Sequence, residues 1–173
     1  MSDFVSAGGG HLELDEERGG ELAARWWQWA LSAPWERSPV RDETGEFADW
    51  QQPDDVWFLA GTYGGRVVRR CSIPTGRPVF FPVVNTQRPQ SLLQREPMVL
   101  EVAGAKVFLN ALPLPIREFT SPPFRAEEKR RVAWGLWCAF EPLPAGQYVV
   151  EIKAMTSGGF RVDTTYHLTV TDD

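Results

Sequence analysis

The chain has 173 residues, a formal net charge of −5 and 43% hydrophobic residues. This length and composition predict one globular domain with a sizeable core and exclude a disordered chain. The acidic balance argues against nucleic acid as a partner, because binding to phosphates needs a basic surface. No segment has the roughly 20 consecutive apolar residues of a membrane span, so no membrane partner is expected either.

The N-terminus has neither a positively charged region nor an apolar run, which predicts a cytoplasmic protein without a secretory signal. The two cysteines, Cys71 and Cys138, form no Cys-x-x-Cys motif, and the two histidines, His11 and His167, lie far apart. We therefore expect two free thiols, no metal site and no cofactor. Phosphate-loop, dinucleotide-binding, Gly-x-Ser-x-Gly and His-Glu-x-x-His motifs are absent from the sequence.

Residues 1–11, which include three consecutive glycines, are expected to form a flexible arm, and residues 12–173 a single domain. A helix is predicted for about residues 15–32. Its acidic first turn, which starts at Asp15, suits the positive end of the helix dipole, and Pro34 cannot continue a helix. The apolar face of this helix is rich in tryptophan and is expected to pack on a sheet.

The predicted core is built around a short apolar and aromatic run, residues 56–62. Residues 66–74 alternate in polarity and follow it after Gly64-Gly65, so we expect the two runs to form a hairpin. A third strand is predicted at residues 79–85. These three strands should form the centre of the core.

The rest of the chain continues in short strands. Residues 98–102 and 106–110 flank Ala103-Gly104-Ala105 and predict a second hairpin. About eight strands with turn signals between them, and one helix, indicate a mainly β fold. We expect an antiparallel β-sandwich or jelly roll with one N-terminal α-helix packed on it. The last strands are predicted at residues 131–140, 147–154 and 160–170.

Two long polar connections, residues 34–55 and 86–97, are expected at one end of the sandwich. Long loops in a compact domain are either functional or held in place by their own side chains. Five residues in or near these loops are candidates for ligand binding: Asp42, Trp50, Gln52, Trp57 and Asn85.

These candidates allow two interpretations. In the first, Asp42, Gln52 and Asn85 form a hydrogen-bonding site with Trp50 and Trp57 as its apolar walls. In the second, which we favour, the polar side chains anchor the backbone: Asp42 caps its turn, Gln52 ties down the loop, and Asn85 ends a strand.

The last predicted strand places Asp163, Thr165 and His167 on one face. A carboxylate, a hydroxyl and an imidazole in a row could relay a proton, which makes Asp163 and His167 candidate catalytic residues. The alternative, which we favour, is that these residues form the polar outer face of the strand.

Several motifs occur together along the chain: Trp26-Trp27-x-Trp29, Asp42-x-Thr44-Gly45, Val56-Trp57-Phe58-Leu59-Ala60-Gly61, Arg70-Cys71-x-Ile73-Pro74 and Phe80-Phe81-Pro82-Val83-Val84-Asn85. In this combination the chain resembles a family of uncharacterised bacterial β-sandwich proteins, many of them exported. The resemblance covers most of the chain and implies no known activity. Those relatives tend to carry a cysteine at the position of Ala48, and the resemblance implies that it pairs there with the equivalent of Cys71. The absence of that cysteine here fits a reducing cytoplasm.

The sequence thus favours a binding or interaction protein that holds a small molecule or a protein partner through loops 34–55 and 86–97. An alternative is a small β-fold enzyme that acts on an apolar or aromatic metabolite by acid/base or conformational catalysis. Such an enzyme needs an enclosed pocket with a carboxylate or histidine inside. A third hypothesis is a self-assembling protein, which predicts an exposed aromatic patch and a homo-oligomer.

Overall fold

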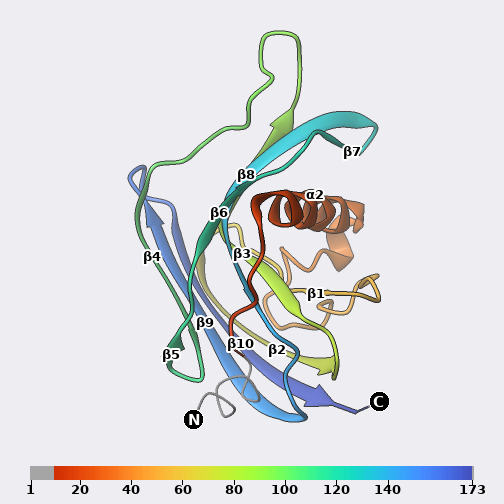
Figure 1. The fold of residues 1–173 in the computed structure, drawn as a ribbon, viewed down its shortest axis with the longest axis vertical. Coiled ribbons are helices and arrows are strands. Elements are labelled where there is room, and N and C mark those ends of the chain that lie inside the picture. Colours follow the sequence, from red (N-terminus) through yellow and green to blue (C-terminus); the bar gives the residue numbers. More distant parts are fainter. Residues whose placement is uncertain (1–9, 173) are drawn as a thin grey trace.

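The computed structural model describes residues 10–172, which form three layers (Figure 1). One helix, α2 (Glu16–Ser32), lies in the hollow of a curled sheet, and a second sheet covers the other face of that sheet. This arrangement confirms the predicted mainly β fold with an N-terminal helix packed on a β-sandwich. Of the arm predicted for residues 1–11, residues 1–9 lie outside the described part. His11 pairs with Phe140 in an isolated bridge.

Sheet A is the curled sheet, and both of its faces are buried. Its helix side carries Phe80, Trp137 and Ala139, which pack against α2. Its other side carries Phe81 and Cys138, which belong to the core between the sheets. The strand order is β1 (Trp57–Phe58), β3 (Val79–Pro89), β8 (Lys129–Phe140) and β6 (Arg117–Thr120), and β7 (Phe124–Ala126) also pairs with β8.

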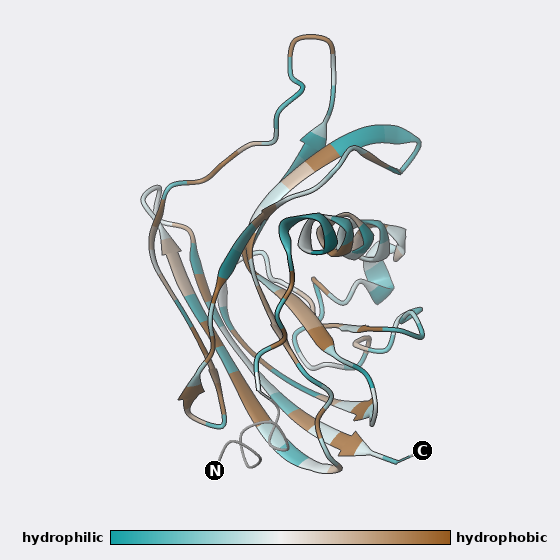
Figure 2. Cartoon of the chain, viewed as in Figure 1, coloured by the Kyte–Doolittle hydropathy of each residue, from teal (hydrophilic) through white to brown (hydrophobic). Residues whose placement is uncertain are grey.

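Sheet B has one buried face and one face toward solvent, as an alternating sequence predicts. In β10, Val162, Tyr166 and Leu168 are buried, whereas Asp163 and His167 are only half-buried. Figure 2 shows the resulting apolar bands along the strands. The strand order is β2 (Gly65–Pro74), β10 (Arg161–Thr171), β9 (Gly146–Thr156), β4 (Val102–Leu109) and β5 (Leu112–Pro113).

Helix α2 begins and ends where the sequence predicts. The Asp15 side chain accepts a hydrogen bond from the Arg18 N–H at 2.7 Å and caps the first turn. A Cβ atom at Gly19 would lie 2.3 Å from the ring of Phe119 on β6. This glycine therefore lets the helix approach sheet A closely. Among residues 10–172, no helix is long and apolar enough to cross a bilayer.

Both predicted hairpins are wrong. Strand β1 pairs in parallel with β3 of sheet A, and β2 pairs in parallel with β10 of sheet B. Gly64 and Gly65 both have positive φ angles, 112° and 82°, but they carry the chain from one sheet to the other. Gly104 lies at a bulge within the single strand β4, and the chain turns instead at Asn110 and Ala111, whose φ angles are 48° and 67°.

Candidate interaction site

The loop of residues 34–55 is folded around the carboxylate of Asp42. This carboxylate accepts hydrogen bonds from the N–H groups of Thr44 and Phe47, both at 2.9 Å, and from the Thr44 hydroxyl at 3.0 Å. Burial alone would raise the pKa of the Asp42 carboxyl, but these hydrogen bonds outweigh burial and hold the pKa below its usual range. The capping role predicted for Asp42 accounts for all three contacts.

The same turn covers the outer edge of β2. The Thr44 carbonyl accepts a hydrogen bond from the Arg70 N–H at 2.9 Å. Gly45 has a φ of 97°, and a Cβ atom there would lie 2.0 Å from the Arg70 carbonyl oxygen. Only glycine fits this position, so the Asp42-x-Thr44-Gly45 motif protects a strand edge.

Below the turn, the guanidinium of Arg69 is 1% exposed. It donates to the carbonyls of Asp42 at 2.7 Å, Val40 at 3.0 Å and Gly61 at 3.1 Å, and to the Tyr166 hydroxyl at 2.8 Å. Arg69 thus fastens the loop to the segment that follows β1. The alternation of β2 could have revealed that this side chain points inward.

The side chain of Gln52 makes the hydrogen bonds to β1 that a neighbouring strand would otherwise make. Its amide nitrogen donates to the carbonyls of Ala48 and Phe58, and its amide oxygen accepts from the Phe58 N–H, each at 2.8 Å. These bonds satisfy both backbone groups of Phe58 on the side of β1 that has no neighbouring strand. The contacts account for Gln52 as an anchor of its loop.

Trp50 and Trp57 do not form walls of one pocket, because they lie on opposite sides of sheet A. The Trp50 indole packs with the helix and donates to the Ser32 hydroxyl at 3.0 Å. Its carbonyl accepts a hydrogen bond from the Trp29 indole. Trp57 is buried between the two sheets, with the guanidinium carbon of Arg77 5.7 Å from the centre of its ring.

Asn85 does not end a strand, which corrects its predicted role, because β3 continues to Pro89. It lies opposite Gly135, where a Cβ atom would come within 2.7 Å of both the Asn85 Cβ and the Trp137 Nε1. Asn85 and Trp137 therefore both pack closely against Gly135, which leaves no room for a side chain there. Within residues 10–172, its amide nitrogen has no hydrogen-bond partner.

Asp163 and His167 share the outer face of β10 with Thr165, as predicted. In the described part of the chain, no hydrogen bond joins the three side chains. Asp163 lies opposite Arg66 and His167 lies opposite Arg70 in the parallel pair of β10 and β2. The structure therefore does not assemble the proton relay.

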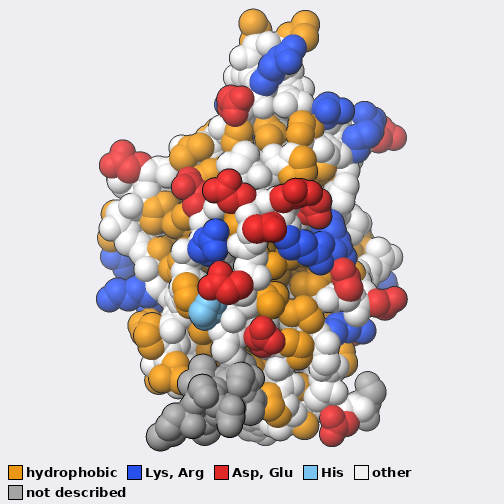
Figure 3. Space-filling model, in the orientation of Figure 1, with side chains coloured by type: hydrophobic (Ala, Val, Ile, Leu, Met, Phe, Trp, Pro, Cys, Tyr) orange, Lys and Arg blue, Asp and Glu red, His pale blue; other side chains and the backbone are white. Residues whose placement is uncertain are grey.

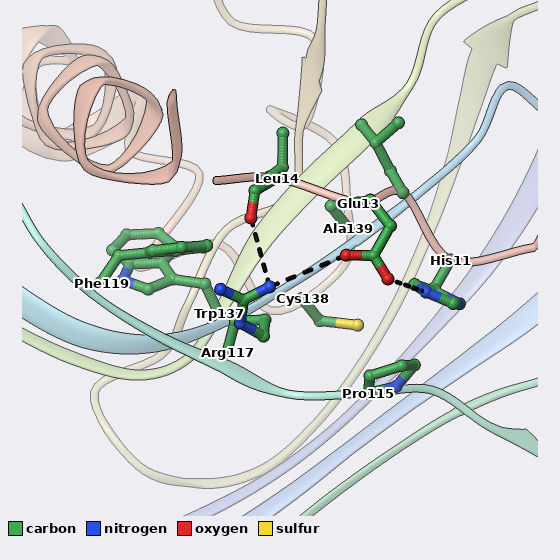
Figure 4. A pocket seen from close by; sticks show the side chains of 10 residues that line it. His11, Glu13, Leu14, Pro115, Arg117, Phe119, Trp137, Cys138 and Ala139 are labelled. Carbon is green, nitrogen blue, oxygen red and sulfur yellow. Dashed lines mark hydrogen bonds and ion pairs between the residues drawn. The ribbon is translucent and has the colours of Figure 1, made fainter. Parts of the chain in front are cut away.

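A small cavity near the N-terminus brings together a carboxylate and an imidazole (Figure 4). His11 and Glu13 lie 2.8 Å apart, and the guanidinium of Arg117 lies 3.8 Å from Glu13. The hydrogen bond from His11 lowers the pKa of Glu13. The cavity measures about 30 Å³, which is room for about two water molecules, so it does not admit a metabolite. No cluster of three or more His, Cys, Asp or Glu side chains in residues 10–172 is placed to hold a metal ion.

The feature that stands out most from the body is the connection after β3, residues 90–98, called the protruding loop below. It extends beyond both sheets at the top of Figure 1. At its tip the Ser91 N–H donates to the Gln94 carbonyl at 3.0 Å and closes a turn. The two central residues of this turn, Leu92 and Leu93, are 85% and 97% exposed. Figure 3 shows hydrophobic side chains at the upper end of the molecule, where the protruding loop lies.

The protruding loop is held in place by side chains of β3 and of its own base. The Arg88 guanidinium donates to the Glu96 carbonyl at 2.8 Å, and the Gln90 amide donates to the Arg95 carbonyl at 2.9 Å. The Thr86 hydroxyl donates to the Met98 carbonyl. The side chains of Thr86, Arg88 and Gln90, at alternate positions, thus bond the returning segment in place of backbone hydrogen bonds between strands. The two leucines are therefore presented on a fixed support.

Beside the tip lies an open hollow of about 550 Å³, whose lining includes Leu92, Pro123, Arg95 and Arg130. Arg130 donates to the side-chain oxygen of Gln90 at 3.1 Å, which fixes one wall of the hollow. An apolar surface thus lies next to two guanidinium groups. The sequence predicts a loop at residues 86–97 but does not reveal that the two leucines are exposed at its tip. Their signal is an apolar pair in a polar segment between two prolines.

Comparison of the chain with protein-family models, with curated proteins and with solved structures finds no match.

Proposed function

We propose that this chain is a binding module that docks on a protein partner through the protruding loop. The observation that carries the proposal is the exposure of Leu92 and Leu93 on a loop fixed by side-chain hydrogen bonds. Burying both side chains would contribute about 4 kcal/mol, a sizeable incentive for association. Large apolar residues are normally kept off a projecting tip, because they promote unwanted contacts.

The surroundings of the tip support a protein partner rather than a small molecule. The tip is convex and the hollow beside it is concave, so together they suit a partner surface that has both a recess and a projection. Arg95 and Arg130 would receive acidic groups of the partner, which favours correct orientation.

A cytoplasmic location is part of this proposal. Cys71 and Cys138 are both free, which fits a reducing compartment. Burial raises the pKa of each thiol to about 12, so neither is a reactive thiolate. The cavity that contains His11 and Glu13 gives the enzyme hypothesis no support, because it is too small for a substrate.

The homo-oligomer also stays a prediction. Trp35 and Tyr63 are exposed and pack together with ring centres 5.9 Å apart. They form an aromatic pair that could bind a second copy. Leu92 and Leu93 are more fully exposed than Trp35 and Tyr63, so the protruding loop is the surface that we propose for docking.

Photocrosslinking in the source cells tests the proposal. Leu93 is replaced with p-benzoylphenylalanine, and a matched variant carries the same probe in place of Leu112, which is 62% exposed on β5. We expect one covalent protein adduct of defined mass from position 93 and none of that mass from position 112. Excess wild-type chain should suppress the adduct, whereas the double variant Leu92→Asp and Leu93→Asp should not.

Three results would count against the proposal. The same adducts from both positions would show non-specific contact. Crosslinks to lipid alone would point to a membrane surface. An adduct of twice the chain mass as the sole product would point to self-association.

A further inference from the structure

The outer face of sheet B is basic, although the whole chain carries a net charge of −5. Five basic side chains point to this face from four adjacent strands, against two acidic ones. A sheet face of this kind raises the local concentration of anions. The basic residues are Arg66, Arg70, Lys106, Lys153 and Arg161, and the acidic residues are Glu151 and Asp163.

One end of this face contains a hollow of about 380 Å³. Its outward polar side chains are Arg70 of β2, His167 and Thr169 of β10, and Gln147 of β9, and the apolar Val149 of β9 lies opposite His167. His167 lies directly opposite Arg70, and Thr169 lies directly opposite Gln147. Neighbouring strands are about 4.8 Å apart, and alternate residues of a strand about 6.6 Å apart. The four polar side chains therefore start from a patch about 12 Å across at its widest, between Arg70 and Gln147.

All four side chains can donate hydrogen bonds. Arg70 offers five N–H groups, Gln147 offers two, and His167 and Thr169 offer at least one each. No carboxylate lines the hollow. Within residues 10–172, none of the four side chains takes part in an ion pair or a hydrogen bond. Their donors are thus available to a ligand.

The backbone beneath the hollow is fixed. Strand β10 is the second strand of sheet B and is paired along its whole length with both β2 and β9. On the outer side of β2, the Arg70 N–H is bonded to the Thr44 carbonyl at 2.9 Å. The donors are therefore attached to one of the best-supported parts of the fold, which lowers the cost of ordering them around a ligand.

We infer that this hollow binds an anionic group of a small molecule, a phosphate or a carboxylate. The Arg70 guanidinium can contact two oxygens of such a group side by side. The His167 ring N–H and the Gln147 amide, on the neighbouring strands, contact the remaining oxygens of a phosphate or the remaining lone pairs of a carboxylate. The site uses His167 as a ligand-binding residue and not as part of a relay with Asp163. It is separate from the protruding loop and does not depend on the docking proposal.

Proton NMR tests the inference directly, because the chain has only two histidines and therefore two imidazole Hε1 signals. Inorganic phosphate, and in a second arm sodium acetate, is added at constant pH and constant ionic strength. We expect the His167 signal to move along a saturable curve while the His11 signal stays in place. Saturation by phosphate alone or by acetate alone would identify the anionic group, and either result supports the site.

Two exposed arginines of β2 provide a matched pair of variants. Arg70→Ala should weaken the saturable response about tenfold or more, because a charge-assisted contact is lost. Arg66→Ala, four residues away on the same face, should leave it within about twofold. The inference is overturned if His167 responds no more than His11, or if both variants weaken the response equally. The latter result would mean an adventitious ion on a basic surface only.

Discussion

Arg69 offers the sharpest test of the claim that the loop of residues 34–55 is structural. Replacing it by Arg69→Met keeps much of the side-chain volume but removes every donor. The carbonyls of Val40, Asp42 and Gly61 would then be buried without a partner. Each such group costs about 1–3 kcal/mol. The guanidinium no longer has to be desolvated, which offsets part of the loss, so we expect a net destabilisation of about 3 kcal/mol.

Urea unfolding followed by tryptophan fluorescence measures this change in the free energy of unfolding. The control is Arg66→Met, an exposed arginine on the same strand, which should change stability by less than about 0.5 kcal/mol. A loss below about 1 kcal/mol for Arg69→Met would refute the reasoning. It would show that the loop is held by other contacts and that Arg69 is free for another role.

Three further predictions concern the same loop. Asp42→Asn should destabilise the protein by about 2 kcal/mol at pH 7, because charge-assisted hydrogen bonds weaken. The pKa of Asp42 is lowered in the folded state, so this stabilisation is present above the usual pKa of the carboxyl and is lost as the pH falls through the folded pKa. The difference in the free energy of unfolding between wild type and variant should therefore be smaller at pH 3 than at pH 7. Gly45→Ala should lower the free energy of unfolding by more than about 2 kcal/mol, because φ is positive at this position and the added Cβ would collide with the Arg70 carbonyl. An unchanged midpoint of urea unfolding would contradict the argument that this turn protects the edge of β2. Ala48→Cys should form a disulfide with Cys71, which intact-mass analysis would detect as a loss of two hydrogens. The disulfide should stabilise the oxidised protein by about 3 kcal/mol. Free thiols after oxidation would count against the resemblance to the exported family.

The sequence predicts the fold well where local patterns decide it. The helix of residues 16–32 has a capping residue and a following proline, and the strands at the C-terminal end alternate clearly. It fails where pairing between distant segments decides. Gly64-Gly65 has the composition of a hairpin turn, but β2 pairs with β10, almost a hundred residues later. No local signal distinguishes these outcomes.

Among the site residues too, roles that depend on local contacts could be predicted, and roles that depend on distant pairing could not. Asp42 and Gln52 act on backbone groups close to them in the chain, so their anchoring roles could be predicted. The position of Asn85 inside β3 depends on how far β8 continues to pair with it, which the sequence does not reveal. Leu92 and Leu93 are visible in the sequence as an apolar pair, but their exposure depends on the folded surface and could not be predicted.

The most direct test of the docking proposal is native mass spectrometry of the protein purified from its own source, wild type beside the double variant Leu92→Asp and Leu93→Asp. The proposal predicts that the wild type retains a second protein and that the variant, with an unchanged melting temperature, does not. A wild type that retains no second protein, or the same complex in both proteins, would contradict the proposal that the protruding loop is the docking surface.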